Sequence, residues 1–328
     1  MRMVHYKSIL LIASGGGHTG YIVGVAEKLR SKSSELTIDI VIPCGDLWSQ
    51  TLLEKYADRI LCVPKPRLPG ENFVQLLRNI PSAIYYSLRR IKQYNIVVAS
   101  GSNHSLAPAL ISMLKGSKLY VIESHDRFVT KGKTVALLSS IGGETVLHWD
   151  EQKKLYPRGH VFGPIVRQKK YESIDKGYIL AIGGFEGNKK LYDILVETEL
   201  ENVVLQTGRV DPEIYRSKRP EWIVFRFDPD LDKWIAGAKV VIGHNSVTIL
   251  EAAVTYRKPV VLLWNPKWKA AATKKDVEIF ARKINGVFLD ELSRDKLLDA
   301  IEKAIKNKPP QYMNGADKFA EYLIENIV

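Results

Sequence analysis

A glycine-rich segment near the start of the chain, SGGGHTG at positions 14–20, is the first place where residue types and spacing indicate chemistry. Glycine allows positive φ and a close approach of the main chain to a ligand, and a following helix would offer free N–H groups to an anion. Gly16, Gly17 and Thr19 could contact such an anion, and His18 could act as a general base or as a cation beside phosphate. The segment matches neither GxGxxG nor GxxxxGK[ST], so a tight turn without a ligand explains it about as well.

Two later segments in the first half also carry polar residues directly after apolar runs. SGSNHSLAPAL (100–110) contains Asn103 and His104, which could receive a polar ligand or merely close a strand-to-helix turn. In YVIESHDR (120–127), Glu123 is a candidate acid or base, and an ion pair between Glu123 and Arg127 is the structural alternative. The seven histidines show no HxxxH or similar spacing, so the sequence predicts no histidine metal site.

The second half has two comparable segments, AIGGFEGN (181–188) and IGHNSVTILEA (242–252). Four polar side chains would surround the N-terminus of a helix in the latter, a good place for phosphate: His244, Asn245, Ser246 and Thr248. Glu251, seven residues after His244, could accept the hydroxyl pair of a ribose. The alternative is a capping network, with Asn245 or Ser246 as N-cap and Glu251 near backbone donors.

The elements that must position these segments alternate along the chain, as in α/β proteins. Apolar, β-branched runs predict strands at 8–14, 37–43, 59–64, 96–100 and 118–124, and again at 177–184, 201–208, 221–227, 238–244 and 258–264. A polar stretch at 163–177 is interpreted as a linker. We therefore predict two Rossmann-like domains, 1–165 and 166–328, with the last helix as a candidate to pack back on the first. Ligands of such sheets bind beyond the carboxyl ends of the strands, where the glycine-bearing segments fall.

Composition narrows the class of protein. The 328 residues are 45% hydrophobic and 26% charged, which is typical of a folded chain of about two domains. A net charge of +12 suits nucleic acid, an anionic membrane or phosphorylated substrates. No stretch is long and apolar enough to span a membrane, and no pattern of a nucleic-acid-binding motif occurs. Two cysteines predict a reducing compartment and provide neither a disulfide framework nor a cysteine-rich zinc site.

Segment 71–94 differs from the other helical stretches because basic and aromatic residues alternate with apolar ones along it. Such a basic amphipathic helix is typical of a segment that lies in a lipid interface. A surface helix whose apolar stripe packs on the sheet is the alternative.

Together these motifs resemble the two subunits of the eukaryotic N-acetylglucosaminyltransferase that adds the second sugar to dolichyl-diphosphate-N-acetylglucosamine, fused into one chain. Residues 8–165 resemble the acceptor subunit through SGGGHT, SGSNHSLAPALISML, YVIESHDR and VLHWDEQKKLYPRGHVFGPI. Residues 177–290 resemble the donor subunit through YILAIGGFEGNKKLYDIL, NVVLQTGR, FDPDLDKWIAGAKVVIGH and TILEAAVTYRKPVVLLWNPK. Single-chain relatives occur in archaeal N-glycosylation, and bacterial MurG is a more distant relative.

The resemblance implies the GT-B fold, with the parallel sheets of two Rossmann-like domains facing an interdomain cleft. It also implies a UDP-sugar donor, usually UDP-N-acetylglucosamine, a lipid-linked diphosphate-sugar acceptor, and inversion at the anomeric carbon without a metal ion or other cofactor. We expect the protein to be cytoplasmic and peripherally bound to the cytoplasmic membrane face through 71–94, with no nucleic-acid partner.

Residue roles follow from the same resemblance. Glu123 is our preferred general base, with His18 as the other candidate. The acceptor phosphates are assigned to Gly16, Gly17, Thr19, Asn103, His104 and Arg127. The donor is assigned to Gly183, Gly184, Phe185, Arg209, His244, Asn245, Ser246, Thr248 and Glu251. The chain departs from the family at His244–Thr248, where the donor subunit has His-Ala-Gly-Ala-Gly, and at Lys274–Asp276, where it has Asn-His-Gln. These departures leave the donor sugar open.

Two other classes of function fit the same motifs. UDP-N-acetylglucosamine 2-epimerases share the two-domain fold and act on a soluble substrate. A non-catalytic module would bind a nucleotide sugar without turning it over.

Overall fold

The computed structural model describes residues 7–67, 71, 73–266 and 272–327. The chain divides into two compact units. The first comprises Met1–Arg127, Lys131–Arg167 and Met313–Val328, and the second comprises Phe128–Thr130 and Gln168–Tyr312. The main crossing from one unit to the other therefore lies at Arg167/Gln168, inside the predicted linker, and the C-terminal helix belongs to the first unit.

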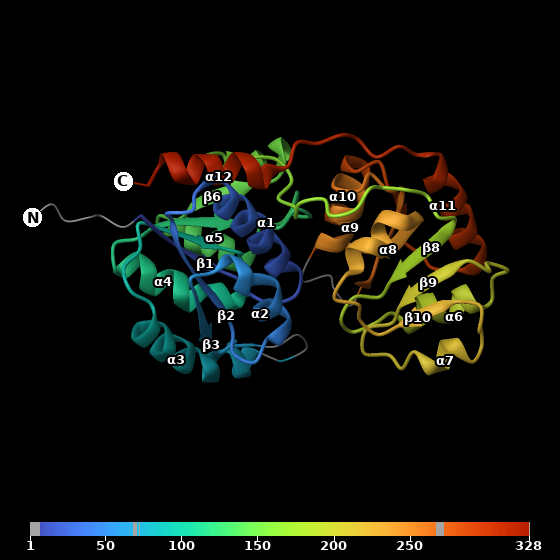
Figure 1. Ribbon diagram of the computed structural model, residues 1–328, viewed down its shortest axis with the longest axis horizontal. Helices are drawn as coiled ribbons and strands as arrows, with labels where there is room; N and C mark the ends of the chain where they lie inside the picture. Colours follow the sequence, from blue (N-terminus) through green and yellow to red (C-terminus); the bar gives the residue numbers. More distant parts are fainter. Residues whose placement is uncertain (1–6, 68–70, 72, 267–271, 328) are drawn as a thin grey trace, which may run out of the picture. The chain divides into compact units, whose positions relative to one another are not determined.

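The first unit is a parallel sheet of seven strands in the order β3-β2-β1-β4-β5-β6-β7 (Figure 1). Its strands are β1 Ser8–Ile12, β2 Thr37–Pro43, β3 Arg59–Val63, β4 Ile96–Ala99, β5 Lys118–Ile122, β6 Glu144–Leu147 and β7 His160–Val161. Its α-helices are α1 Gly17–Lys32, α2 Leu47–Leu53, α3 Phe73–Arg90, α4 Leu106–Leu114, α5 Lys133–Ser140 and α12 Gly315–Glu325. Short 3₁₀ helices occupy Glu54–Tyr56, Asn103–Ser105 and Asp150–Lys154.

The second unit is a parallel sheet of six strands in the order β10-β9-β8-β11-β12-β13. Its strands are β8 Tyr178–Ile182, β9 Val203–Gln206, β10 Ile223–Phe225, β11 Ala238–His244, β12 Val260–Leu263 and β13 Val287–Leu289. Its helices are α6 Lys189–Val196, α7 Glu213–Arg216, α8 Leu231–Gly237, α9 Val247–Val254, α10 Lys274–Lys283 and α11 Arg294–Lys306. Both units thus have the Rossmann-like architecture that the alternation of apolar runs predicted.

Burial explains why the strand sequences are apolar on both faces. In β1 the side chains of Ile9, Leu10, Leu11 and Ile12 are all fully buried, because helices cover both sides of the sheet. The central strands of the second unit have the same character, and β12 reads VVLL with all four residues buried. Such strands bury a large apolar area, which is the main favourable term in folding.

The C-terminal helix α12 lies along α1 in the first unit (Figure 1). Ala316, Phe319, Ala320 and Leu323 of α12 are fully buried. Lys28 and Lys32 of α1 form ion pairs with Asp317 of α12 at 3.0 and 3.5 Å. The last helix therefore completes the first unit although it follows the whole second unit in sequence.

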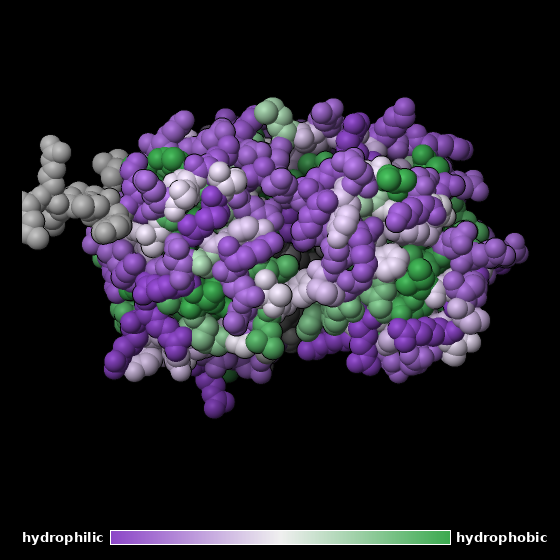
Figure 2. All heavy atoms as spheres, in the orientation of Figure 1, coloured by the Kyte–Doolittle hydropathy of each residue, from purple (hydrophilic) through white to green (hydrophobic). Residues whose placement is uncertain are grey.

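Helix α3 covers one end of the first unit with one face and exposes the other. Ala83 is fully buried and Ile84 packs against the core of the first unit, whereas Val74, Leu77, Tyr85 and Leu88 are 68%, 54%, 55% and 52% exposed. Figure 2 shows hydrophobic side chains on the visible face in separate patches within a mainly hydrophilic surface. Within the described residues, no helix is both long and apolar enough to cross a membrane.

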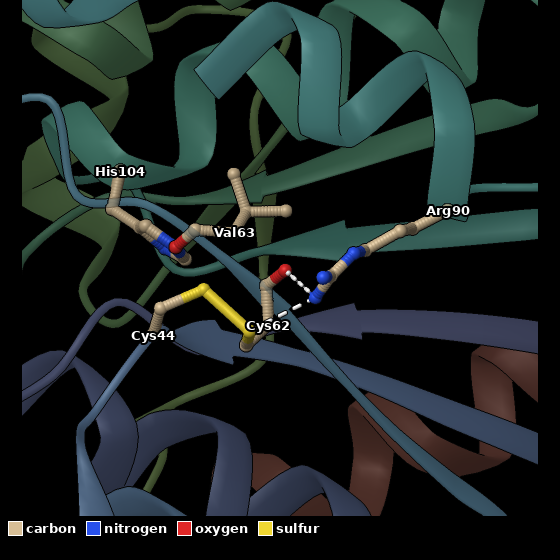
Figure 3. The surroundings of a disulfide bond; sticks show 5 residues. All are labelled: Cys44, Cys62, Val63, Arg90 and His104. Carbon is tan, nitrogen blue, oxygen red and sulfur yellow. Dashed lines mark hydrogen bonds between the residues drawn. A yellow bond between two sulfur atoms is a disulfide. The ribbon is translucent and has the colours of Figure 1, made fainter. Parts of the chain in front are cut away.

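The two cysteines form a disulfide, Cys44–Cys62, which the cysteine count had not led us to expect. Cys44 directly follows β2, and Cys62 lies in β3, the strand that pairs with β2. The disulfide therefore links two neighbouring strands of the sheet. Figure 3 shows Arg90 of α3 beside the bond, where its Nη1 donates to the carbonyl oxygen of Cys62 at 2.7 Å and lies 2.9 Å from Cys62 Sγ. A disulfide is unusual in a reducing compartment. The redox state of these cysteines in the isolated protein therefore tests that expectation directly.

We expect reduction of this disulfide to lower the free energy of unfolding by about 3 kcal/mol, because it removes a crosslink between residues 18 apart. Urea unfolding with and without dithiothreitol measures the difference. The double variant Cys44→Ser/Cys62→Ser should match the reduced protein and should not respond to the reductant. Two free thiols in the unfolded protein before reduction would contradict the prediction.

Candidate functional site

The first candidate site lies where the chain order reverses in the sheet of the first unit. Strands β1 and β4 are neighbours, but the chain visits β2 and β3 on the other side of β1 before it reaches β4. The loops that follow β1 and β4 therefore diverge from the same edge, and ligands of open α/β sheets bind at such switch points. Segments 14–20 and 100–110 from the sequence analysis begin with these two loops and continue into the helices that follow them.

Serine hydroxyls connect the two loops beneath the surface. Ser14 Oγ lies 2.8 Å from Ser105 Oγ and accepts a hydrogen bond from Ser100 Oγ at 2.9 Å. All three side chains are fully buried. Because buried hydroxyls must find partners, this network fixes the spacing of the loops after β1 and β4.

The glycine-rich loop itself is shaped by positive φ angles, 82° at Gly15 and 57° at Gly16. Gly16 and Gly17 are exposed, so their backbone N–H groups can face a ligand at the start of α1. Thr19 is fully buried instead, accepts from Gly15 N at 3.2 Å and lies 2.7 Å from Ser49 Oγ. Thr19 therefore supports the loop from below and does not reach its surface, unlike the phosphate contact that we predicted.

Two residues that the sequence analysis missed support the same loop. Lys65, just after β3, donates from Nζ to the carbonyl oxygen of Ser14 at 2.9 Å. Asp46 caps α2 by accepting from Ser49 N at 3.0 Å and from Ser49 Oγ at 2.7 Å. A side chain at Gly15 would approach both Asp46 and Lys65. The only signal in the sequence is that each of them follows a strand at this edge.

His18 is half-buried on the first turn of α1 and is oriented by one short hydrogen bond. Its Nδ1 lies 2.6 Å from the carbonyl oxygen of Ser100, the residue that follows β4. A carbonyl oxygen can only accept, so Nδ1 carries the proton and Nε2 of the neutral ring keeps its lone pair. Burial, opposed by the bond to Ser100, lowers the pKa of His18 and favours this neutral form.

Glu123 lies in a different environment from the one that a general base needs. It is 1% exposed, and its two carboxylate oxygens accept three hydrogen bonds, from Ser124 N at 2.8 Å, Gly132 N at 2.9 Å and Tyr156 Oη at 2.7 Å. Burial raises its pKa, and these three bonds oppose the rise. The geometry therefore gives Glu123 the role of holding the loop from 124 to 132.

Asn103 and His104 begin the short helix after β4. His104 is fully buried, its Nε2 lies 3.0 Å from Val63 O (Figure 3), and burial lowers its pKa to about 4. Asn103 is half-buried and donates from Nδ2 to Arg67 O at 3.2 Å. A neutral, buried His104 cannot contact an acceptor phosphate directly, so the structure corrects that part of the prediction. Arg127, the last predicted acceptor residue, is half-buried.

Three further aromatic side chains form a buried cluster behind Glu123. Tyr21 Oη lies 2.5 Å from His125 Nδ1, and the ring of Tyr21 is 5.0 Å from that of His148. His148 Nε2 lies 3.0 Å from the carbonyl oxygen of Glu123. Burial lowers the pKa of His125 to about 4 and that of His148 well below its ordinary value. This cluster ties α1 to the loop after β5.

The second candidate site lies at the switch point of the other sheet, between the neighbouring strands β8 and β11. Gly184 follows β8 with a φ of 70°, and a Cβ there would lie 2.6 Å from His244 Cε1. The imidazole of His244, the last residue of β11, therefore packs directly against the glycine loop. Gly183 is equally restricted, because a Cβ would overlap the hydroxyl of Tyr192.

The start of α9 adopts the cap that the sequence analysis gave as an alternative. Ser246 is the N-cap and accepts from Ile249 N at 3.3 Å. Asn245 and Thr248 are half-buried beside it, while Glu251 is 2% exposed. Capping uses one N–H group of the first turn, so other N–H groups of this turn can still face an anion.

Phe185 and Arg209 form the outer part of this site. The side chain of Phe185 is 57% exposed, and the guanidinium of Arg209 lies 4.5 Å from the centre of its ring. Arg209 N also donates to Phe185 O at 3.0 Å. A cation on an exposed aromatic ring forms a flat surface that a planar base could stack against.

Asp276 belongs to the segment Lys274–Asp276, where the sequence differs from the donor subunit that it resembles. Its carboxylate forms hydrogen bonds within the protein. It is fully buried and accepts from Phe128 N and Val129 N at 2.7 Å each and from Thr130 Oγ1 at 2.9 Å. It also forms a capping box with Thr273. Burial acts to raise its pKa, but these bonds outweigh burial and lower it. Asp276 thus anchors residues 128–130 to the second unit and has no oxygen left for a sugar.

The described residues contain no group of three or more histidine, cysteine, aspartate and glutamate side chains arranged to hold a metal ion.

Comparison with known proteins gives the fold. No protein-family model and no curated protein matches the sequence. MurG from Acinetobacter baumannii has a TM-score of 0.63 at 17% identity, with 97% of this chain and 99% of that chain covered. The glycosyltransferase of kitacinnamycin has a TM-score of 0.68 at 10% identity, with 98% and 99% covered. UDP-GlcNAc 2-epimerase from Neisseria meningitidis, bound to UDP-GlcNAc, has a TM-score of 0.57 at 14% identity, with 97% and 99% covered. The chain has the GT-B fold, as the motifs implied.

The buried histidines predict a stability that depends on pH. Burial lowers the pKa of His104, His125 and His148, so each takes up a proton more readily in the unfolded chain. The contribution of these neutral histidines to the free energy of unfolding is fully present above the pKa of an unfolded histidine, about 6.5. It should be lost as the pH falls toward about 4. Urea midpoints measured across this range test the expectation. His104→Asn should reduce the dependence, and a midpoint that does not change with pH would contradict it.

Proposed function

We propose that this protein is an inverting glycosyltransferase that moves a sugar from a UDP-sugar to a lipid-linked diphosphate-sugar acceptor. The sugar that we propose is N-acetylglucosamine. The observation that carries the proposal is His18, a neutral histidine oriented at the switch point of the first sheet of a GT-B chain. Its Nε2 lone pair is available, and glycine N–H groups that can bind phosphate lie beside it.

In the proposed reaction, His18 is the general base. Nε2 takes the proton of the acceptor hydroxyl as its oxygen attacks the anomeric carbon, and the bond from that carbon to the UDP oxygen breaks. The Ser100 carbonyl, 2.6 Å from Nδ1, would then stabilise the imidazolium that forms. This assignment replaces our preference for Glu123, whose carboxylate is buried and already accepts three hydrogen bonds.

The leaving diphosphate is assigned to the second unit. N–H groups at the start of α9 and the loop after β8 would bind it, with His244 close to both. The uracil base is placed against Phe185 and Arg209. Helix N-termini supply the positive potential that a cation would otherwise supply, so we propose transfer without a divalent metal.

Lipid-linked acceptors are concentrated at membranes, and α3 supports a membrane-facing role for the first unit. Its exposed side chains Val74, Leu77, Tyr85 and Leu88 recur at helical spacing, and Arg89 stands over the ring of Tyr85 at 5.4 Å. We propose that this face lies in the cytoplasmic leaflet. Ile84, in the same helix, packs inward against the core of the first unit instead.

Incubation with UDP-sugars and a polyprenyl-diphosphate sugar, followed by mass spectrometry of the lipid, tests the proposed reaction. We expect transfer from UDP-N-acetylglucosamine that persists in EDTA. His18→Asn should lower kcat by about a hundredfold or more without changing donor binding, because the donor is assigned to the second unit. His160→Asn, a histidine on β7 paired with Glu144, is the control and should keep full activity.

Four outcomes would contradict the proposed reaction or the proposed base. No transfer to any lipid-linked acceptor would contradict it. Conversion of free UDP-N-acetylglucosamine would identify an epimerase instead, and donor binding without turnover would identify a binding module. Full activity of His18→Asn would show that His18 is not the general base.

Membrane binding is tested by flotation with phosphatidylglycerol vesicles. Leu77→Ser/Tyr85→Ser/Leu88→Ser should lose most vesicle binding, because these three side chains are exposed on α3 and each buried apolar side chain contributes about 1.5–3 kcal/mol. The matched control is Leu114→Ser, an 82% exposed leucine at the end of α4. Binding that survives the triple substitution would assign the contact to another surface.

A further inference from the structure

The second unit has a cavity at the edge of its sheet that the proposed reaction does not use. It has a volume of about 480 Å³, within the range of small-molecule sites. Thr255, Arg257 and Pro259 from the turn before β12 line it, so it lies at the amino-terminal end of that strand. The donor loops follow the carboxyl ends of β8 and β11, at the opposite edge of the sheet.

The charges that line this cavity all have one sign. Lys169, Arg257 and Lys308 line it, and no carboxylate does. Among the described residues, neither Arg257 nor Lys308 forms an ion pair, and Lys169 pairs with Glu172, whose side chain is 85% exposed. Such an exposed pair is weak and can exchange for a bound anion. Burial lowers the pKa of Lys258, next to Arg257 in the chain; the charge of Asp175 opposes this effect and that of Lys169 adds to it.

The backbone at Arg257 is unusual for an arginine. Its φ is 52°, in the left-handed region, three residues after α9 ends at Val254, in a turn where Lys258 N donates to Ala252 O at 2.8 Å. Glycine is the usual residue at such a position, because a Cβ makes this conformation unfavourable. The other non-glycine residue with positive φ in the described part of the chain is Asn285, a type that tolerates it. The fold therefore accepts strain at Arg257 and exposes a guanidinium at the cavity.

The opposite wall is held in place by hydrogen bonds and prolines. Asn285 Nδ2 donates to Lys308 O at 3.0 Å, and Asn307 Nδ2 donates to Asn285 O at 3.1 Å. Pro309 and Pro310 restrict the chain that follows. The backbone that carries Lys308 is thus fixed before any ligand binds, which lowers the entropic cost of binding.

Helix ends do not cancel this positive field. Helices α9 and α11 both end at the cavity, and each C-terminus carries roughly half a negative charge, about one charge in total. Three full positive charges remain larger than that sum. A neighbouring cavity has the opposite character, since Glu199, Glu201 and Glu302 line it with a single lysine, Lys239.

We propose that the cavity between Arg257, Lys308 and Lys169 is a binding site for a phosphate-bearing anion, separate from the donor edge. Arg257 would bind two oxygens of one phosphate through its planar guanidinium, and the two lysines would neutralise the remaining charge. The ligand is either a soluble phosphate ester or the headgroup of an anionic lipid, which present the same chemistry.

Isothermal titration of the full chain with inorganic pyrophosphate tests the proposal, with Arg257→Gly as the main variant. Glycine suits the left-handed conformation, so this variant should fold with an unchanged or higher melting temperature. It should nevertheless bind pyrophosphate at this site about tenfold to a hundredfold more weakly, as should Lys308→Ala. UDP binding at the donor edge should not change. Lys239→Ala, in the neighbouring cavity, is the matched control and should behave like the wild type.

A second arm uses phosphatidylglycerol vesicles in place of pyrophosphate. The vesicle measurements use the Leu77→Ser/Tyr85→Ser/Leu88→Ser background, so that binding through α3 does not contribute. Loss of the remaining vesicle binding when Arg257→Gly is added, with no pyrophosphate effect, would assign the site to a lipid headgroup. The proposal is overturned if Arg257→Gly and Lys308→Ala bind both probes as the wild type does. A lower melting temperature with unchanged binding would likewise overturn it, because Arg257 would then serve only the end of α9.

Discussion

The reversal of strand order at the centre of each sheet is the constraint on which the rest of the structure depends. A crossover helix covers the strands on either side, but the loops after the two central strands leave in opposite directions and cannot cover one another. Backbone N–H groups and polar side chains therefore gather at this edge without being buried by the fold. In the first unit these are the loops after β1 and β4, and in the second those after β8 and β11. Both candidate sites follow from this single topological fact.

Fixing such loops requires polar contacts, because few apolar contacts are available there. In the first unit the bonded hydroxyls of Ser14, Ser100 and Ser105 link the loops after β1 and β4. Glu123 and Asp276 serve the same purpose on a larger scale, each using a buried carboxylate to accept several hydrogen bonds from a loop. A buried charge is tolerated only when it is satisfied in this way, and removing its partners is costly. Buried acidic residues in this protein therefore fix loops, as Glu123 does just after β5 and Asp276 does in the first turn of α10.

The sequence was most informative where apolar runs are long and polar residues follow them. Its ten predicted strands all occur, and the segments 14–20, 100–110 and 242–252 begin at the two switch points. It missed β6, β7 and β13, which lie at or next to one edge of their sheets. It also missed Lys65 and the bond between Cys44 and Cys62. The disulfide joins segments that the pairing of β2 with β3 brings together, and the bond from Lys65 to Ser14 also depends on the pairing of β1 with β2.

The sequence by itself determined the architecture, because burial on both faces of a parallel sheet can be read from composition along each strand. It also determined which loops carry polar groups, since these follow the strands directly. The tertiary structure alone decided which way each side chain faces. Thr19 and His104 are buried and His18 is half-buried, although all three lie at the start of a helix that follows a strand. Likewise, Glu123 is enclosed because Gly132 and Tyr156, distant in sequence, supply its hydrogen bonds. Residue type fixes the chemistry that a side chain can perform, but its exposure and partners depend on packing between segments far apart in the chain.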